Sequence, residues 1–270
     1  RTSTFPDVWK QSRITPIYKN GDRSNVTNYR PITIINNLAK VFEHVLHILI
    51  YPHVSNMITD SQHGFVKGRS TVTNLVLKTQ YLSEVLDEQG QVDCIYTDFS
   101  RAFDRIDHRL MLIKLKYFGF SDHLITLINS YLLGRTQYVF LNGYRSKWYE
   151  QLSGVPQGSV LGPLLFNMFI NDITLHLTAK CLIYADDLKI FHQIRNWSDC
   201  LNLQRNLDTL SDWSVSNNLP LNYSKCYVMT YSRKQNTIDF DYSIASNVLE
   251  RLHHIKDLGV TFDLKLNFIQ

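Results

Sequence analysis

Apolar residues recur every three or four positions in several stretches of this chain, a spacing that predicts amphipathic helices. One such set is Leu38, Phe42, Val45 and Leu49. A later stretch begins at a Ser or Thr that suits a helix N-cap and continues with apolar residues at the same spacing. Helices are therefore expected over 36–50, from Ser70 or Thr71 through Leu86, and over 108–118, 121–133, 162–177 and 198–217.

Between these helices lie short segments that are apolar or alternate between apolar and polar residues, which predicts strands. An Asn-Gly pair at 142–143 and an Asn-Gly-Asp run at 20–22 mark tight turns. The combination predicts an α+β fold with helices packed on one face of an antiparallel sheet. The expected strands are 92–99, 136–142, 145–152, 226–231, 237–244 and 255–262, together with 180–194, which divides into two around Asp186-Asp187.

Length and composition narrow the class of protein. The chain has 270 residues, of which 44% are hydrophobic and 19% charged, as is typical of a folded domain with a sizeable core. No run of 18 apolar residues occurs, so no membrane span is expected. Because the chain starts without an initiator Met or an apolar signal core, we expect an internal fragment of a longer intracellular protein, nuclear or cytoplasmic.

The positive charge is concentrated in the first quarter of the chain. Residues 1–69 hold nine Lys and Arg against four Asp and Glu, whereas residues 70–270 hold 19 against 20. A localised basic face suits a polyanion such as nucleic acid or a triphosphate. An uneven but merely solvated surface is the alternative interpretation of the same counts.

Two apolar segments, CIYTDF at 94–99 and CLIYADD at 181–187, each lead into aspartate. Because side chains alternate along a strand, Asp98 and Asp186 should each share a face with the tyrosine two residues before it. The two aspartates can then converge if the strands are neighbours. A polar hairpin turn is the alternative for Asp186-Asp187, but the apolar residues on both sides of the pair favour a site.

Converging carboxylates repel one another and are costly to desolvate unless a cation neutralises them. Their hard oxygen atoms suit Mg²⁺ or Mn²⁺. Two such ions, about 4 Å apart, could clamp the attacking and leaving oxygens of a phosphoryl transfer. The sequence therefore predicts a two-metal site at these aspartates.

Seven blocks of sequence occur in a set order along the chain, from about residue 9 to 265. They are NYRPITIINNLAKVFEHVL at 28–46, QHGFVKGRST at 62–71, DFSRAFDRIDH at 98–108, GVPQGSVLGPLLF at 154–166, YADD at 184–187, LNYSK at 221–225 and DLGVTFD at 257–263. Together they resemble the reverse transcriptase domain of non-LTR (LINE-type) retrotransposons. The resemblance implies the fingers and palm of a right-hand polymerase without its thumb.

The resemblance also implies limits for these parts within a single 1–270 reverse transcriptase domain. The fingers would span about 1–91 with part of 109–157. The palm would span about 92–108 and 158–265 and would include a hairpin similar to a primer grip.

The resemblance assigns the central chemistry to a few residues. Asp98, Asp186 and Asp187 would form the catalytic triad and hold two Mg²⁺ or Mn²⁺ ions, with the carbonyl of Phe99 as a further ligand. Phe103 would be the aromatic gate beneath the incoming sugar. Its bulk would clash with a ribose 2′-OH and so favour dNTP over NTP.

Other positions are assigned to the nucleotide by the same resemblance. Arg30, and less strongly Lys19, would contact the triphosphate, a task that suits the permanently charged and bidentate guanidinium. Gln157 and Gly158 would pack against the nucleotide. Lys225 would act on the pyrophosphate leaving group as a proton donor.

The remaining assignments concern nucleic acid. Lys67 and Arg69 are expected to contact the template backbone. Leu258 and Gly259 belong to the segment that resembles the primer grip, the hairpin that holds the primer 3′ end.

The expected function is RNA-directed DNA synthesis, in which a primer 3′-OH attacks the α-phosphate of a dNTP and pyrophosphate leaves. The expected partners are an RNA template, a DNA primer and dNTP, and the sequence does not set the oligomeric state. One alternative is a truncated, inactive transposon-derived fragment that only binds nucleic acid. Another is a metal-dependent phosphohydrolase that uses the same carboxylates.

Overall fold

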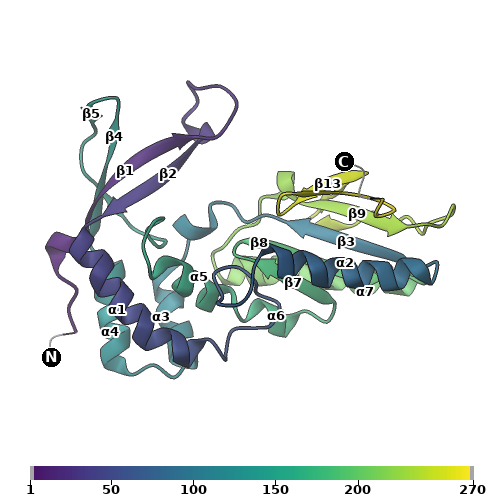
Figure 1. Cartoon of the computed structure of the whole chain (residues 1–270), viewed down its shortest axis with the longest axis horizontal. Helices are drawn as coiled ribbons and strands as arrows, with labels where there is room; N and C mark the ends of the chain where they lie inside the picture. The colour runs from purple at the N-terminus through teal and green to yellow at the C-terminus, as the bar shows by residue number, and fades with distance from the viewer. Residues whose placement is uncertain (1–2, 268–270) are drawn as a thin grey trace. The chain divides into compact units, whose positions relative to one another are not determined.

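The computed structural model describes residues 3–267, and the chain divides into two compact units (Figure 1). The first unit comprises Arg1–Met57 and Arg101–Phe169, and the second comprises Ile58–Ser100 and Ile170–Gln270. These boundaries differ from the limits expected for fingers and palm, and that division stays a prediction. Residues 1–2 and 268–270 of the predicted domain lie outside the described residues.

A five-stranded sheet with mixed strand directions is the main β structure of the first unit. The elements of this unit are β1 (Gln11–Tyr18), β2 (Tyr29–Ile35), α1 (Asn37–Val54), α3 (His108–Tyr117), α4 (Asp122–Leu132), β4 (Arg135–Leu141), β5 (Tyr144–Arg145), β6 (Tyr149–Gln151) and α5 (Gly162–Ile170). The strand order is β2-β1-β4-β5, with β6 beside β4, and β1 runs parallel to β4. The polar start of the chain thus forms two strands around the predicted turn at 20–22.

Helix α1 has the predicted type but buries a different face from the one that its apolar spacing suggested. Leu38, Val45 and Leu49 are exposed, whereas Ala39 and Ile50 are buried. The helix carries apolar residues around most of its circumference, so the spacing of one set does not tell which stripe is covered.

Among residues 3–267, every helix is too short or too polar to span a membrane.

The second unit contains another five-stranded sheet. The strand order in this sheet is β12-β9-β3-β8-β7, antiparallel except for the β12–β9 pair. The elements are α2 (Thr71–Asp87), β3 (Gln91–Thr97), α6 (Ile173–His176), β7 (Lys180–Tyr184), β8 (Asp187–Gln193), α7 (Trp197–Ser216), β9 (Tyr227–Ser232), β10 (Ser243–Ile244), β11 (Asn247–Val248), β12 (Glu250–Arg251), β13 (His254–Asp257) and β14 (Val260–Asp263).

Both faces of this sheet are covered by helices, so the expectation of helices on one face is wrong. Every residue of β3 is buried. On one face Cys94 packs in a core cluster with Leu82 of α2. On the other face Asp93 accepts a hydrogen bond from Tyr242 Oη at 2.8 Å and lies near Cys200 of α7. In Figure 1, α2 lies in front and α7 is partly hidden behind it.

Three predicted elements are shorter or more interrupted than expected. The strand expected over 145–152 is present only as the short β5 and β6. The helix expected over 162–177 ends at Ile170 and resumes as the short α6. Within 237–244 only Ser243–Ile244 is a strand. Outside that strand, the side-chain amide of Gln91 bonds both the N–H and the carbonyl of Ile238, in place of the bonds of a strand ladder.

Candidate active site

The edge of the sheet in the second unit brings two aspartates opposite each other. Strands β3 and β8 pair antiparallel, with Thr97 opposite Leu188. Continuing this register by one residue places Asp98 opposite Asp187. Residues that lie opposite each other in antiparallel strands point to the same face of the sheet. Strand β8, which follows the aspartate turn, is therefore the neighbour that brings the carboxylates together.

Asp186 lies in a turn and not on a strand face. Strand β7 ends at Tyr184, which pairs with Asp187 across the hairpin. Ala185 and Asp186 form the two-residue loop between them, and Ala185 has a φ of +57°. The expectation that Asp186 shares a face with Tyr184 is therefore wrong, because the alternation of side chains stops where the turn begins.

The three aspartates influence one another through their charges. Desolvation by the surrounding protein, followed by the negative charges of Asp186 and Asp98, raises the pKa of Asp187 to about 6. The side chain of Asp187 nevertheless reaches solvent. Oxygen ligands of this kind suit a hard divalent cation. Among residues 3–267, however, no three His, Cys, Asp or Glu side chains are grouped closely enough to hold one ion.

The segment around Lys225 extends this edge of the sheet. The amide of Asn222 donates to the carbonyl of Asp98 at 2.7 Å, and Asn222 Nδ2 donates to Asp98 Oδ2 at 3.2 Å. Lys225 Nζ lies 3.4 Å from the same carboxylate oxygen. Phe99 forms a bridge with Leu221 and is buried. The structure thus brings Lys225 and Asp98 together.

The two candidate template contacts, Lys67 and Arg69, lie in the loop before α2. Lys67 is exposed. Arg69 Nη1 donates to the carbonyls of Thr59 and Gln62, each at 2.7 Å, and its Nη2 lies 2.7 Å from Asp60 Oδ1. The guanidinium of Arg69 therefore holds its own loop together, and its contact with a template stays a prediction.

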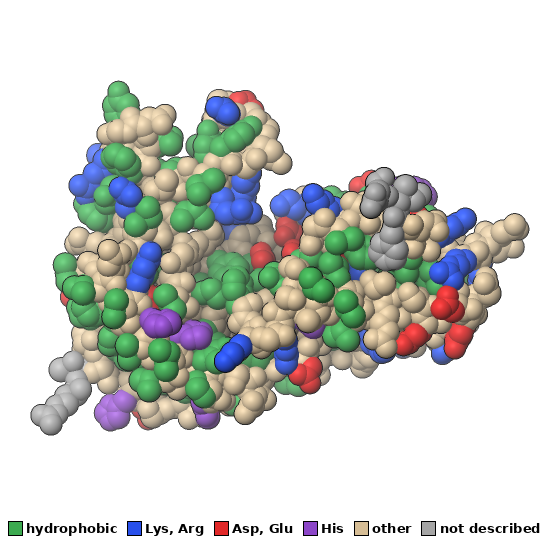
Figure 2. Space-filling model, viewed as in Figure 1, with side chains coloured by type: hydrophobic (Ala, Val, Ile, Leu, Met, Phe, Trp, Pro, Cys, Tyr) green, Lys and Arg blue, Asp and Glu red, His purple; other side chains and the backbone are tan. Residues whose placement is uncertain are grey.

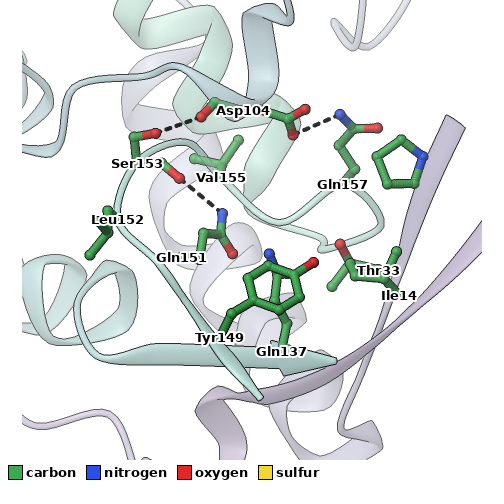
Figure 3. A pocket seen from close by; sticks show the side chains of 11 residues that line it. Ile14, Thr33, Asp104, Gln137, Tyr149, Gln151, Leu152, Ser153, Val155 and Gln157 are labelled. Carbon is green, nitrogen blue, oxygen red and sulfur yellow. Dashed lines mark hydrogen bonds between the residues drawn. The ribbon is translucent and has the colours of Figure 1, made fainter. Parts of the chain in front are cut away.

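A cavity of about 270 Å³ lies within the first unit (Figure 3). Gln157 Nε2 donates to Asp104 Oδ1 at 2.8 Å, and Ser153 Oγ donates to the Asp104 carbonyl at 2.8 Å. Burial raises the pKa of Asp104, although the bond from Gln157 opposes this shift. The amide of Gln157 thus has a fixed orientation. The cavity is lined by Ile14, Pro31, Thr33, Asp104, Gln137, Tyr149, Gln151, Leu152, Ser153, Val155 and Gln157.

Gly158 and Phe103 are fixed by neighbours within the same unit. Gly158 has a φ of +117°, and a Cβ on it would lie 2.6 Å from the carbonyl oxygen of Thr33, so only glycine fits beside β2. The ring of Phe103 stacks on Phe166, with ring centroids 4.4 Å apart and planes at 22°. The aromatic side chain therefore has a defined position.

The two candidate triphosphate ligands, Lys19 and Arg30, are exposed on the β1–β2 hairpin. Arg30 pairs with Ile17, two residues before Lys19, so both cations lie on one face. Thr33, which lines the cavity, lies on the other face of β2. Figure 2 shows Lys and Arg side chains over this hairpin and over β4–β5.

Leu258 and Gly259 form the two-residue loop between β13 and β14. Both have positive φ, as is usual in tight hairpins. Just before the loop, the buried Asp257 is held by two buried lysines. Lys78 Nζ of α2 lies 2.6 Å from Asp257 Oδ2, and Lys189 Nζ of β8 lies 2.7 Å from Oδ1. These ion pairs join the hairpin to the sheet that carries Asp187.

Sequence reasoning missed four polar residues that the structure places at these sites. Asp104 orients Gln157, and Gln62 bonds the backbone of the aspartate turn at Ala185. Lys189 and Asp257 anchor the hairpin. A signal for Lys189 was available, because a lysine inside an apolar strand needs a buried counter-charge. For Gln62 no local signal exists, since its partner lies 123 residues away.

The chain is similar to known proteins along most of its length. The family described as reverse transcriptase (RNA-dependent DNA polymerase) matches residues 17–262. The RNA-directed DNA polymerase from mobile element jockey of Drosophila melanogaster is 29% identical over 276 residues, covering 98% of this chain and 30% of that protein. The Drosophila funebris counterpart is 31% identical and covers 99% of this chain and 30% of that protein. The chain thus spans about 30% of the length of these relatives.

Solved structures share the fold. The apo telomerase of Candida tropicalis superposes with a TM-score of 0.63 at 12% sequence identity, covering 96% of this chain and 48% of that one. A second structure of that telomerase, truncated from the C-terminal domain, gives a TM-score of 0.61 at 13% identity over 96% of this chain and 54% of that one. These identities support a common α+β fold and no more.

Proposed function

Since the chain belongs to the reverse transcriptase (RNA-dependent DNA polymerase) family, we propose that it takes part in RNA-directed DNA synthesis. The predicted resemblance to the non-LTR retrotransposon domain is confirmed by relatives such as mobile element jockey. The register that sets Asp98 opposite Asp187, with Asp186 in the adjacent turn, is the observation that carries the proposal. In the reaction, the primer 3′ oxygen attacks the α-phosphorus of a dNTP and pyrophosphate leaves.

In this proposal Asp98, Asp186 and Asp187 hold two divalent cations, Mg²⁺ or Mn²⁺, with the Phe99 carbonyl as a further ligand. The raised pKa of Asp187 supports it, because desolvation and the negative charges of Asp186 and Asp98 make a negative charge on Asp187 costly, and a bound cation would relieve that cost. The cations would neutralise charge on the transferred phosphoryl group. The sheet edge would orient the carboxylates of Asp98 and Asp187, and the turn would orient that of Asp186.

We assign the nucleotide to residues of the first unit. Phe103, held against Phe166, excludes a 2′-OH by bulk, and Gln157, oriented by Asp104, packs on the nucleotide beside Gly158. Arg30 and Lys19 on the exposed hairpin face supply positive charge for the triphosphate.

Residues of the second unit would act on the leaving group and the nucleic acid. Lys225 donates a proton to the pyrophosphate, and its position at Asp98 supports this role. Lys67 and Arg69 contact an RNA template, and the loop of Leu258 and Gly259 contacts the DNA primer. With these roles we assign about 1–91 and part of 109–157 to the fingers of a right-hand polymerase, and about 92–108 and 158–265 to its palm; these limits do not follow the boundaries of the two units.

Primer extension on poly(rA)/oligo(dT) with dTTP and Mg²⁺ tests the function. We expect the chain to extend the primer and Asp186→Asn to reduce incorporation to background, because one ligand charge is lost. Asp208→Asn, on α7, serves as the control and should extend normally.

Two other outcomes would contradict the proposal. Salt-dependent nucleic-acid binding without extension would indicate a fragment that only binds. Release of phosphate or pyrophosphate from dNTP without template and primer would indicate a phosphohydrolase.

A further inference from the structure

We propose that Gln62 is a positioning residue that holds the turn carrying Asp186 in its working conformation. The inference rests on the proposed function, because it concerns the carboxylate turn of the same site. Gln62 belongs to the loop before α2, and its side chain bonds the backbone of the turn. It acts through the backbone of Ala185, the residue that precedes the aspartate pair.

The segment before α2 lies alongside strand β7. The amide of Ile183 donates to the carbonyl of Ser61 at 2.8 Å, and the amide of His63 donates to the carbonyl of Ile183 at 2.8 Å. Gln62 therefore forms a parallel bridge with Ile183. This short ladder carries the side chain of Gln62 to the end of β7, where the turn begins.

The amide of Gln62 bonds both backbone groups of one turn residue. Gln62 Oε1 accepts from Ala185 N at 3.0 Å, and Gln62 Nε2 donates to the Ala185 carbonyl at 3.4 Å. The same Oε1 accepts from Gly64 N at 2.7 Å. Gln62 is only 1% exposed, so water does not compete for these groups. A glutamine is suited to this position because its amide both accepts and donates.

Ala185 needs this support because of its backbone conformation. Its φ of +57° lies in the left-handed region, which residues with a Cβ adopt only at an energetic cost. Such strain persists where the surroundings hold the residue in place. Without the two bonds from Gln62, the turn would relax toward other conformations and would move the carboxylate of Asp186.

Gly64 allows the close approach that these bonds require. A Cβ on Gly64 would lie 2.3 Å from the nitrogen of Ala185, far inside contact distance. Any larger residue would push the loop away from the turn. The Gln62-His63-Gly64 sequence thus combines the bonding group with the space that it needs.

A purely structural role for Gln62 can be separated from a positioning role by a matched control. Gln91 is also buried, and its side chain bonds both backbone groups of Ile238. Gln91 Nε2 donates to the Ile238 carbonyl at 2.9 Å, and Ile238 N donates to Gln91 Oε1 at 2.8 Å. It lies at the start of β3, at the other end of that strand from Asp98. Gln91→Met therefore removes an equivalent set of bonds without touching the turn.

The experiment compares Gln62→Met with Gln91→Met in the same chain. We expect both variants to lose stability, but only Gln62→Met to lower kcat for nucleotide addition, by about 10- to 100-fold, with little change in KM for the template–primer. Amide hydrogen exchange at residues 184–187 should be faster in Gln62→Met and unchanged in Gln91→Met. Adding Ala185→Gly to Gln62→Met should restore part of the lost kcat, because glycine adopts positive φ without strain.

The outcomes separate this inference from the function on which it rests. Equal losses of kcat in the two methionine variants, or unchanged exchange at 184–187 in Gln62→Met, would overturn the positioning role. An inactive parent chain whose turn exchanges faster only in Gln62→Met would overturn the proposed function and keep the positioning role. If Gln62→Met fails to fold, Gln62→Glu and Gln91→Glu, which keep the acceptor oxygen, are compared with the same expected order.

Discussion

Lys225 holds its ammonium nitrogen 3.4 Å from Asp98 Oδ2, and both side chains reach solvent. A cation bound at Asp98 must therefore compete with this ion pair. We expect Lys225→Gln to bind Mg²⁺ more tightly, by about 2- to 5-fold for a partly exposed pair. The same variant should lose about 100-fold in kcat, since the leaving group loses its proton donor.

Titration of primer extension with Mg²⁺ measures both effects of Lys225→Gln at once. Lys234→Gln, at an exposed position, is the control and should change neither quantity. Weaker Mg²⁺ binding in Lys225→Gln would show that Lys225 supports the cation and does not compete with it.

Phe103, stacked on Phe166, gives a prediction about sugar selection. Phe103→Ala removes the bulk that would meet a 2′-OH, so rNTP incorporation should rise relative to dNTP by about 10-fold or more. The measurement is kcat/KM for dTTP and UTP on the same template and primer. Phe120→Ala, which removes a ring packed near His53, should leave this ratio unchanged. An unchanged ratio in Phe103→Ala would exclude the gate.

The carboxylate of Asp257 lies between the buried ammonium groups of Lys78 and Lys189 and pairs with both. Asp257→Asn leaves both cations without their counter-charge, and we expect the free energy of unfolding to fall by about 3–5 kcal/mol. Urea unfolding measures this loss. Asp87→Asn removes the partner of Arg233 in an exposed pair and should cost no more than about 1 kcal/mol. Similar losses in the two variants would contradict the anchoring role of Asp257.

The raised pKa of Glu43 on α1 leads us to expect that the stability of the chain depends on pH. Burial raises its pKa above the ordinary value of 4.5, although Val160 N and Leu161 N donate to Oε2 at 2.7 and 3.2 Å. The folded chain then holds this proton more tightly than the unfolded chain, so this group makes the free energy of unfolding fall as pH rises above 4.5.

Glu43→Gln keeps an acceptor for both amides but does not titrate. The stability of the wild type relative to Glu43→Gln should therefore decrease as pH rises above the ordinary pKa of 4.5, as measured by urea unfolding at a series of pH values. A difference that stays constant, or that grows with pH, would show that the pKa of Glu43 is not raised.

Much of the local structure could be predicted from the apolar spacing, since a helix or strand depends on residues close together in the chain. The helix capped by Ser70 and the hairpin at 142–143 are found where they were expected. The spacing was misleading in α1, where Leu38 and Leu49 are exposed, because periodicity identifies a helix but not the neighbour that covers it. The segment 237–242 forms no strand, and side chains bond its backbone at two residues: Gln91 bonds Ile238, and Arg251 donates to the carbonyl of Phe240.

The sequence by itself determined the family, through seven motif blocks in a fixed order, and most of the helices and strands, through the spacing of apolar residues. Only the tertiary structure decided that Asp98 faces Asp187, that Lys225 approaches Asp98 and that Gln62 holds Ala185. The physical reason is that local patterns record the preference of the backbone, whereas strand register, ion pairs and buried hydrogen bonds join residues about 90 to 130 positions apart. Such pairings are set by which surfaces pack together, and no local spacing contains that information.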